Sequence, residues 1–370
     1  MLIRKFRFRS VVSSVVLATT LAGVAMQPSE ACTDVNIVAQ DGSVLSARSM
    51  EFGMPMKSRL VIRPRAMHFT SAAPDGKKGI TWAGKYGYAY LDALNQDVVV
   101  DGMNETGLSV GALYLPGFAA YETIDPTQDK TALSNLQIGA WILSRFASVD
   151  ELKAALPDIH VWGEPVHIFG DHYVPLHYVV HDAAGKSLIL EWVDGKLKTY
   201  DDAVGVMTNS PPYDWQMANL RNYVNLSATN ASPLKIRGLS VRGTGEGSGL
   251  LGLPGDPTPP SRLVQTVFAL NLATQPKDIA GSLVLAQKLM DRVDIPMGMV
   301  RDQKAQGDWT QWNVFYDHQN RRFYYRTYRD STLRMLDLRK VDFDQPAKRM
   351  PIGDGKPVIK EIVAAKIPVL

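Results

Sequence analysis

Residues 32–49, CTDVNIVAQDGSVLSARS, alternate apolar and polar side chains on either side of a short polar turn. The alternation over Asp34–Ala39 and again over Val44–Ser49 predicts two β-strands, because successive side chains of a strand point to opposite faces. Between them, Gln40-Asp41-Gly42-Ser43 is typical of a tight turn. The sequence therefore predicts an antiparallel hairpin that begins just after Cys32.

The segment before this hairpin, residues 1–31, has the three-part layout of a secretory signal peptide. Four basic residues lie near its start, and Val11–Met26 is an apolar run rich in small residues. Small residues at Ser29 and Ala31 predict cleavage directly before Cys32, and hence a periplasmic or secreted protein. A lasting membrane anchor is the weaker interpretation, because the apolar run is short for a membrane span.

Residues 32–370 are predicted to form a single domain. The chain is 45% hydrophobic and 21% charged, as ordinary globular proteins are, and its sequence has no linker-like stretch or repeat that divides it. Removal of residues 1–31 takes away four basic residues and Glu30, so the formal net charge of +3 falls to zero. A neutral chain gives no reason to expect nucleic acid or an anionic membrane as a partner.

Cys32 is the only cysteine of the chain. It cannot form an internal disulfide, so it is a reactive thiol, an intermolecular link or a lipid attachment point. A lipid-anchored binding lipoprotein would place an apolar residue three positions before the cysteine, whereas this sequence has Ser29-Glu30-Ala31. The coincidence with the predicted cleavage point favours a reactive thiol.

A cysteine that becomes the first residue of a chain carries a nucleophile and a base together. The thiol attacks as a thiolate and has an ordinary pKa of about 8.5, while a free α-amino group has a pKa of about 7.7–8.0. The amine can therefore accept the thiol proton near neutral pH, directly or through a water molecule. Before cleavage the same nitrogen is an amide and cannot do so. Cleavage before Cys32 would thus switch on acyl-transfer chemistry.

The remaining periodicities predict an α+β fold, with strands at both ends of the chain and helices between and after them. The further strands are predicted at Leu60–Arg63, Val98–Asp101, Leu108–Leu115, Tyr178–His181, Leu188–Trp192, Gly205–Met207, Gln311–Tyr316 and Arg322–Arg326. The helices are predicted at Leu133–Phe146, Asp150–Leu156, Tyr213–Tyr223, Arg262–Leu272 and Pro276–Asp291, the second of them behind a capping box that begins at Ser148.

Three motifs resemble sites of other protein classes, and each is interpreted as structural rather than functional. The Gly-x-Ser-x-Gly pattern around Ser109 would mark a serine hydrolase if a helix followed, but the next residues are typical of a strand. The dinucleotide-like pattern of residues 247–252 is followed by prolines rather than by a helix. Four histidines, His167, His172, His177 and His181, lack the spacing of a metal site, so we expect no bound metal.

From Cys32 onward the chain resembles the choloylglycine hydrolase family of N-terminal-nucleophile enzymes, which includes penicillin V acylases and bile salt hydrolases. Short blocks carry the resemblance along nearly all of residues 32–370. They are Cys32-Thr33, Ala47-Arg48-Ser-Met-Glu51-Phe52, Asp101-Gly-Met-Asn104-Glu-Thr-Gly-Leu108, Met207-Thr-Asn209-Ser-Pro-Pro, Leu253-Pro-Gly-Asp256, Ser261-Arg262 and Thr310-Gln-Trp312. The resemblance implies a four-layer αββα sandwich of two antiparallel sheets between helical layers, a homotetramer, and no metal or cofactor.

The resemblance also implies roles for individual residues. Cys32 would be the nucleophile and supply the base, Arg48 would lie beside its sulfur, and Glu51 would position the amine where many members have aspartate. The side-chain amide of Asn209 and the backbone N–H of Tyr114 would form the oxyanion hole. Arg262 would hold this polar network together.

The expected activity is hydrolysis of an N-acyl amide through a thioester on Cys32. Tyr114 resembles the penicillin V acylase branch more than the bile salt branch, so penicillin V and N-acyl homoserine lactones rank as substrates before conjugated bile salts. An acyl group needs apolar walls beside a few polar groups. The expected acyl pocket is formed by Phe52, Met54, Met56, Leu115 and Phe118.

Overall fold

The computed structural model describes residues 31–302, 307–353 and 355–359. Its first hairpin is the predicted one, formed by β1 (Thr33–Val38) and β2 (Val44–Phe52), with the Ala39 N–H donating to the Ser43 carbonyl oxygen at 2.9 Å. All nine residues of β2 are buried, because the sheet that contains this strand is covered on both faces.

The sheet that contains the hairpin runs in the order β16-β1-β2-β20-β21-β22, and β19 pairs with β20. Its other strands are β16 (Val206–Met207), β19 (Val300–Arg301), β20 (Gly307–Asp317), β21 (Arg322–Thr327) and β22 (Asp330–Asp337). The predicted second hairpin is therefore confirmed as β20 and β21. It brings the end of the chain beside its beginning, since β20 pairs directly with β2.

The second sheet runs in the order β15-β14-β13-β8-β7-β6-β3-β23 and is antiparallel throughout. Its strands are β3 (Arg59–Arg63), β6 (Tyr88–Ala93), β7 (Gln96–Asn104), β8 (Ser109–Tyr114), β13 (Leu176–His181), β14 (Ser187–Val193), β15 (Lys196–Asp201) and β23 (Lys348–Pro351). Ser109 begins β8, which continues to Tyr114, so the strand expected after Ser109 is present where a serine hydrolase would have a helix.

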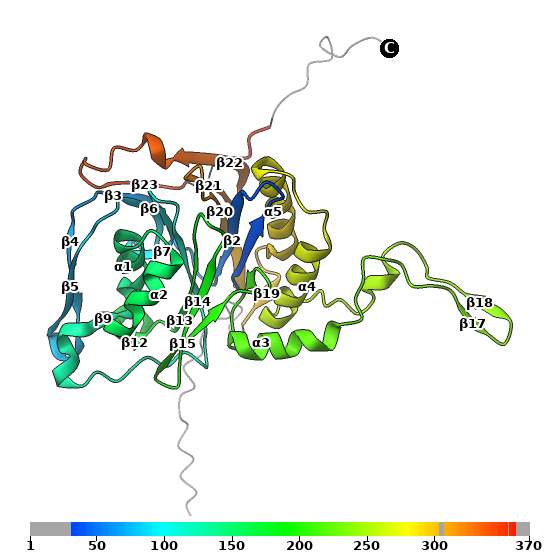
Figure 1. Ribbon diagram of the computed structural model, residues 1–370, viewed down its shortest axis with the longest axis horizontal. Helices are drawn as coiled ribbons and strands as arrows, with labels where there is room; N and C mark the ends of the chain where they lie inside the picture. The colour runs from blue at the N-terminus through cyan, green and yellow to red at the C-terminus, as the bar shows by residue number, and fades with distance from the viewer. Residues whose placement is uncertain (1–30, 303–306, 354, 360–370) are drawn as a thin grey trace, which may run out of the picture.

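Two pairs of helices cover the outer faces of the two sheets (Figure 1). The second sheet is covered by α1 (Ile138–Arg145) and α2 (Val149–Ala155), and the first sheet by α4 (Pro259–Leu272) and α5 (Ile279–Val293). A further helix, α3 (Tyr213–Leu220), follows β16. Three apolar cores fill the spaces between the four layers. The predicted αββα sandwich is confirmed.

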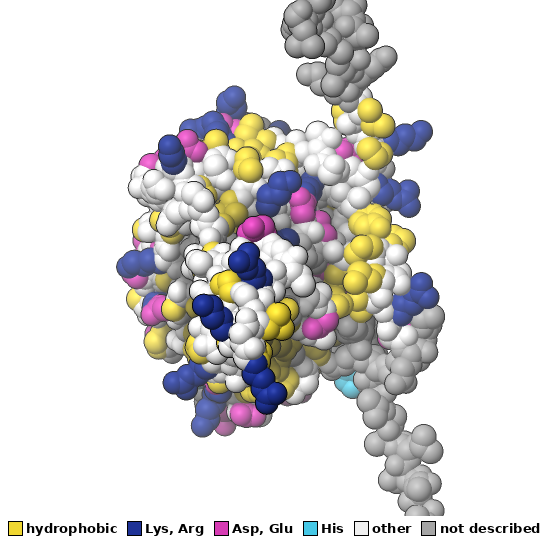
Figure 2. Space-filling view, turned by 90° about the vertical axis from the view of Figure 1, so that its right-hand side faces the viewer, with side chains coloured by type: hydrophobic (Ala, Val, Ile, Leu, Met, Phe, Trp, Pro, Cys, Tyr) yellow, Lys and Arg dark blue, Asp and Glu magenta, His cyan; other side chains and the backbone are white. Residues whose placement is uncertain are grey.

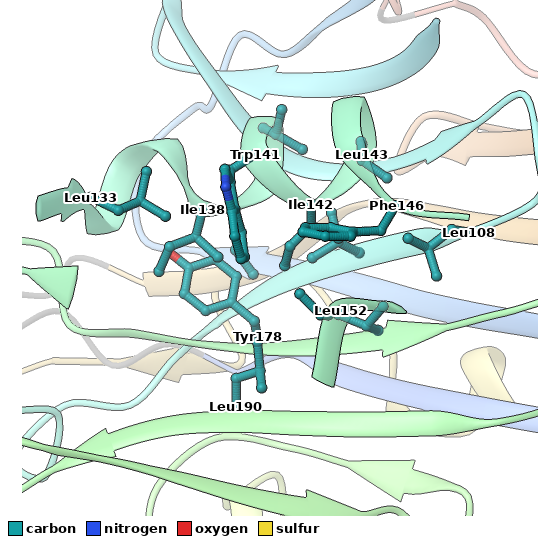
Figure 3. Close-up of a cluster of buried hydrophobic side chains, with 14 of the residues drawn as sticks. Leu108, Leu133, Ile138, Trp141, Ile142, Leu143, Phe146, Leu152, Tyr178 and Leu190 are labelled. Carbon is teal, nitrogen blue, oxygen red and sulfur yellow. The ribbon is translucent and has the colours of Figure 1, made fainter. Parts of the chain in front are cut away.

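The core under α1 is built around Trp141, whose ring meets the edge of Phe146 at a centroid distance of 4.7 Å (Figure 3). Tyr178 and Leu190 reach the same core from strands of the second sheet. Such an aromatic pair contributes about 0.5–1.5 kcal/mol beyond the area that it buries. This packing fixes the strands β7 and β8, which carry the floor of the site described below.

The helix boundaries follow local capping chemistry. The Ser148 hydroxyl accepts from the Glu151 N–H at 3.2 Å and starts α2, and the Asp278 carboxylate accepts from the Gly281 N–H at 2.9 Å and starts α5. The predicted helix at Pro276–Asp291 therefore begins later, at Ile279.

The helix predicted at Leu133–Phe146 is wrong over its first residues. Residues Ala132–Ser134 form a strand, β9, that pairs in parallel with β10 (His160–Trp162), and the helix starts at Ile138. Two small antiparallel pairs were also not predicted. They are β4 (His68–Ala72) with β5 (Lys78–Ala83), and β11 (Pro165–Val166) with β12 (His172–Tyr173).

A hairpin of β17 (Leu234–Ile236) and β18 (Leu239–Val241) projects away from the sandwich (Figure 1). We call residues 226–252 around it the arm. Figure 2 views the molecule from the side on which the arm projects, and apolar side chains there lie among lysines and arginines. Every residue of both arm strands is exposed.

No helix among the described residues is both long enough and apolar enough to cross a membrane.

Candidate active site

Cys32 lies directly before β1, in the core between the two sheets, with 2% of its surface exposed. Its Sγ is 3.3 Å from Arg48 Nη2 and 4.0 Å from Met50 Sδ. Burial raises the pKa of the Cys32 thiol, and the positive charge of Arg48 only partly offsets that increase. The resting thiol is therefore protonated near neutral pH and needs a proton acceptor close by before it can attack.

Arg48 projects from β2 across the space between the sheets. Its Nη1 donates to Asp101 Oδ2 at 2.8 Å, and its Nη2 donates to the Ala112 carbonyl oxygen at 2.5 Å. The Tyr316 hydroxyl donates to the other oxygen of Asp101 at 2.6 Å. Burial raises the pKa of Asp101 to about 6 although Arg48 lowers it. This fully buried ion pair fixes the guanidinium beside the Cys32 sulfur.

Asn209 and Arg262 hold the backbone of Cys32 from both ends. The Cys32 backbone nitrogen donates to Asn209 Oδ1 at 2.5 Å, and Arg262 Nη1 donates to the Cys32 carbonyl oxygen at 2.5 Å. Arg262 Nη2 also donates to Asn209 Oδ1 at 2.8 Å, which closes the network. Since Oδ1 accepts two donors, the amide orientation of Asn209 is determined by its contacts. The position of the Cys32 nitrogen is thus fixed by these side-chain contacts.

Tyr114 ends β8 on the other side of Asn209. The structure joins them through Asn209 Nδ2, which donates to the Tyr114 carbonyl oxygen at 2.8 Å. Nδ2 carries two hydrogens, and this contact uses one of them. The sequence placed the side-chain amide of Asn209 and the backbone of Tyr114 together, and the structure brings both next to Cys32.

Glu51 is fully buried on β2 and contacts two hydroxyl groups. Ser49 Oγ donates to its Oε2 at 3.0 Å, and Thr310 Oγ1 donates to its Oε1 at 2.5 Å. Burial raises the pKa of Glu51 to about 8, although the charge of Arg262 opposes the shift. The atom that the Cys32 nitrogen contacts is Asn209 Oδ1 rather than this carboxylate.

The raised pKa of Glu51 predicts a pH-dependent stability difference. Between about pH 4.5 and 8 the folded carboxyl keeps a proton that the unfolded chain releases, so Glu51 destabilises the fold increasingly as pH rises. The Glu51→Gln variant lacks this titration. The difference in melting temperature between the variant and the parent is therefore expected to increase by several degrees, in favour of the variant, from pH 5 to pH 8. Thermal unfolding of both proteins across this range measures the difference.

The exposed carboxylate of Glu246 supplies the control for that experiment. Glu246→Gln is expected to keep a constant melting-temperature difference from the parent at every pH. If the melting-temperature difference between Glu51→Gln and the parent is also the same at every pH, the raised pKa of Glu51 is contradicted.

An apolar pocket opens beside Cys32 between the two sheets. Cys32, Arg48, Glu51 and Tyr114 form its polar end, and the remaining walls are almost entirely apolar. These walls include Phe52, Met56, Leu94, Val98, Val100, Leu136, Val166, Ile168, Phe169, Val174 and Leu176. A carbonyl carbon at the thiol would therefore leave its acyl substituent in an apolar environment.

Of the five predicted pocket residues, Phe52 and Met56 lie in these walls. Met54, Leu115 and Phe118 are not among the described residues that line the pocket. Leu115 is fully buried in a separate small cluster with Ala119, and Phe118 is 42% exposed. Their placement as pocket walls is corrected.

The dinucleotide-like motif and the four histidines lie in places that do not form a binding site within the described residues. Residues 247–252 form a partly exposed loop with a single 3-10 turn, and the next helix, α4, begins only at Pro259. His177 contacts Glu191, His181 contacts Asp34, and His167 and His172 are exposed. The described residues contain no group of three or more His, Cys, Asp or Glu side chains that could hold a metal ion.

Two groups of functional residues were not singled out from the sequence. Asp101 belongs to a block that carries the resemblance, but only the structure shows that it holds Arg48. The pocket walls at Val166, Ile168 and Phe169 come from the end of the two-residue strand β11 and the 3-10 turn after it, which are too short to show periodicity. No local pattern in the sequence could have placed that segment beside Cys32.

Comparison with known proteins places this geometry in context. The family model described as linear amide C–N hydrolases, choloylglycine hydrolase family, matches residues 32–350. A bile salt hydrolase/transferase of Clostridium perfringens is 30% identical over 318 residues, which cover 85% of this chain and 94% of that protein. A penicillin V acylase of Pectobacterium atrosepticum is 25% identical over 317 residues, which cover 81% and 78%. The crystal structure of a mutant conjugated bile acid hydrolase from Clostridium perfringens matches with a TM-score of 0.79 at 27% identity, and covers 90% of this chain and all of that one.

Proposed function

Because the chain belongs to the choloylglycine hydrolase family of linear amide C–N hydrolases, we propose that it cleaves N-acyl amides through a thioester on Cys32. One observation carries this proposal: the Cys32 sulfur lies at the polar end of an apolar pocket, and the nitrogen of the same residue is held by Asn209. Nucleophile, base and acyl site are therefore supplied within one small region.

In the proposed reaction the free amine of Cys32 takes the thiol proton. The thiolate attacks the amide carbon, and the second N–H of Asn209 Nδ2 with the backbone N–H of Tyr114 donates to the oxyanion that forms. The C–N bond then breaks, the ammonium proton passes to the leaving amine, and the acyl group stays on sulfur as a thioester. A water molecule, deprotonated by the same amine, attacks the thioester and releases a carboxylic acid. Arg48 favours the thiolate in both halves of the reaction.

The substrates that we propose are penicillin V and N-acyl homoserine lactones. Support comes from the pocket, whose walls suit an aryl or alkyl acyl group, and from the similarity to a penicillin V acylase. Conjugated bile salts are the second candidate, because the relative that is 30% identical is named a bile salt hydrolase/transferase. Comparing kcat/KM for penicillin V, decanoyl homoserine lactone and glycocholate tests the order. A higher value for glycocholate would reverse it.

The pocket walls predict which residue sets acyl-chain preference. Met56 lines the pocket, and Met54, two positions away, does not. Met56→Ala creates space and is expected to raise the ratio of kcat/KM for dodecanoyl over hexanoyl homoserine lactone by about fivefold or more. Met54→Ala is the matched control and should leave this ratio unchanged. An equal change in both variants would contradict the position of the acyl site.

We also propose that residues 1–31 are a signal peptide and that the enzyme acts in the periplasm or outside the cell. The family match begins at Cys32, the residue after the predicted cleavage point, which supports this assignment. N-terminal sequencing of the exported protein tests it, with Cys32 expected as the first residue.

A homo-oligomer, and a tetramer by family resemblance, is proposed on the basis of the arm. Leu234 pairs with Val241 and Ile236 with Leu239, so these four side chains share one face of the two-stranded ribbon. All four are exposed, from 43% to 66%. An isolated ribbon with an apolar face is stable only when something packs against it. A second copy of the chain is the proposed partner.

The arm predicts the effect of one charged substitution on assembly. Leu239→Glu would bury a carboxylate in the proposed contact, so the molar mass from light scattering is expected to fall to that of the monomer. Met335→Glu, at an exposed apolar position on β22, is the control and should keep the parent mass. A parent that is already monomeric at micromolar concentration would refute the proposal.

A further inference from the structure

A second groove lies behind the wall of the active-site pocket. Its lining includes Pro55, Lys57, Ser58 and Arg59, Trp309 and Trp312 of β20, Tyr328, Arg329 and Ile352. Nothing in the proposed hydrolysis uses it. The sequence resemblance assigned no role to its cationic residues.

The groove and the active-site pocket share one wall. Met56 faces the pocket, whereas its neighbours Pro55 and Lys57 face the groove. The same division occurs in the turn between β6 and β7, where Leu94 lines the pocket and Asn95 lines the groove. The Leu94 N–H donates to the Met56 carbonyl oxygen at 2.6 Å and joins the two parts of the wall.

This wall is held in a strained backbone conformation. Lys57 and Leu94 have φ values of 49° and 53°, in the left-handed region that such side chains rarely adopt. Such strain persists only where surrounding contacts over-determine the backbone, and it concentrates at binding and catalytic sites. The conformation of this wall is therefore fixed by its own contacts, among them the hydrogen bond from Leu94 to Met56.

The charges of the groove are of one sign. Lys57, Arg59 and Arg329 line it, and no carboxylate of the described residues does. Arg59 is neutralised by Asp92, which its Nε contacts at 2.7 Å. Lys57 and Arg329 are exposed and have no ion-pair partner in the described part of the chain. The two positive charges could bind an anionic group, and the nearby tryptophan and tyrosine rings could contact an apolar part of the same molecule.

We propose that this groove is a second binding site, specific for carboxylates with an apolar or aromatic body. Lys57 and Arg329 would contact the carboxylate, and Trp309 and Tyr328 would contact the apolar part. Hydrolysis of an N-acyl amide releases molecules of this class. Identifying the ligand with a reaction product rests on the proposed function, but the site itself does not.

Gln311 connects the groove with the catalytic side. It lines the groove, its Oε1 accepts from the Met56 N–H at 2.8 Å, and its Nε2 donates to the carbonyl oxygens of Phe52 and Met54 at 3.0 and 2.8 Å. Trp312 lies beside it, with the Arg48 guanidinium 5.7 Å from its ring centroid. A ligand seated in the groove thus contacts the side chains that hold the wall of the acyl pocket.

The test measures binding apart from catalysis. Processed Cys32→Ala protein is titrated with phenoxyacetate and, in parallel, with the uncharged phenoxyacetamide, by calorimetry and tryptophan fluorescence. Adding Lys57→Ala and Arg329→Ala is expected to weaken phenoxyacetate binding about fivefold to tenfold and to leave phenoxyacetamide binding unchanged. Lys130→Ala with Arg292→Ala removes the same charge elsewhere on the surface and should change neither.

A second variant tests the apolar part of the groove. Trp309→Leu is expected to weaken the binding of both compounds and to reduce the fluorescence response. Equal phenoxyacetate affinity in the Lys57/Arg329 variant and its Cys32→Ala parent would overturn the proposal, and so would equal affinity of that parent for the acid and the amide. If the unmodified enzyme hydrolyses amides but the groove does not bind, only this inference fails. If the groove binds and amides are not hydrolysed, the proposed function fails instead.

Discussion

Replacing Cys32 with alanine is expected to reduce amide hydrolysis at least about 10⁴-fold, because the variant loses the atom that would form the thioester. The fold should be retained, since the side chain removed is small and its polar contacts are few. Initial rates on penicillin V, normalised to folded protein, measure the loss. The acyl-enzyme expected for the parent should also be absent from the intact mass of the variant after rapid quenching.

Two control proteins distinguish the contribution of the Cys32 thiol from that of the Cys32 amine. Cys32→Ser keeps the amine and supplies a weaker nucleophile, so it is expected to retain a small residual rate above that of alanine. A chain that keeps Ala31 retains the thiol but has an amide nitrogen, and it is expected to be as inactive as Cys32→Ala. Full activity in either the alanine variant or the uncleaved chain would refute the proposed mechanism.

Replacing Asn209 with alanine is expected to lower kcat by about 10²–10³-fold with a much smaller change in KM. The side chain performs two tasks, since Oδ1 holds the Cys32 nitrogen and Nδ2 faces the Tyr114 carbonyl at the proposed oxyanion site. Removing one donor to an oxyanion alone costs on the order of 10²–10³-fold. Steady-state kinetics on penicillin V and a homoserine lactone check the prediction.

Asn209→Asp and Asn104→Ala provide the matched variants. Aspartate keeps the acceptor for the Cys32 nitrogen and loses the Nδ2 donor, so its kcat shows how much of the effect belongs to the oxyanion. Asn104 is equally buried, but its Nδ2 donates to the carbonyl oxygens of Leu143 and Phe146 and its Oδ1 accepts from Thr106 and Leu108, so it contacts no part of Cys32. Its alanine variant should lose stability while keeping kcat per folded molecule. Comparable kcat losses in the Asn104 and Asn209 variants would contradict a catalytic role for Asn209.

Local periodicity in the sequence was sufficient to predict the strands and helices whose pattern of apolar residues is continuous. The hairpin of β1 and β2 and the hairpin of β20 and β21 were predicted close to their observed bounds. The helix expected from Leu133 failed because its first residues pair with β10, a strand that is distant in sequence. Apolar periodicity over a short stretch does not distinguish such a strand from the first turn of a helix.

The arrangement of the four layers and of the site required more than periodicity. Resemblance to a family placed Arg48, Asn209 and Arg262 together, and the structure brings all three to Cys32. The pocket prediction was only partly correct for a physical reason. It took two apolar loops as walls, but Leu115 packs in a separate buried cluster with Ala119 and Phe118 is 42% exposed, so apolar character alone did not locate the walls.

If residues 1–31 are removed as proposed, the contacts of Asn209 and Arg262 with Cys32 bear on where the chain must be cut. Asn209 binds the nitrogen and Arg262 binds the carbonyl oxygen of one particular residue, and Thr33 next to it already belongs to a paired strand. An end that is ragged by one residue would displace the terminal amine by about 3.3 Å, which is more than the length of either contact. In the proposed mechanism, only a chain cut directly before Cys32 would therefore place its terminal amine at Asn209 and be active.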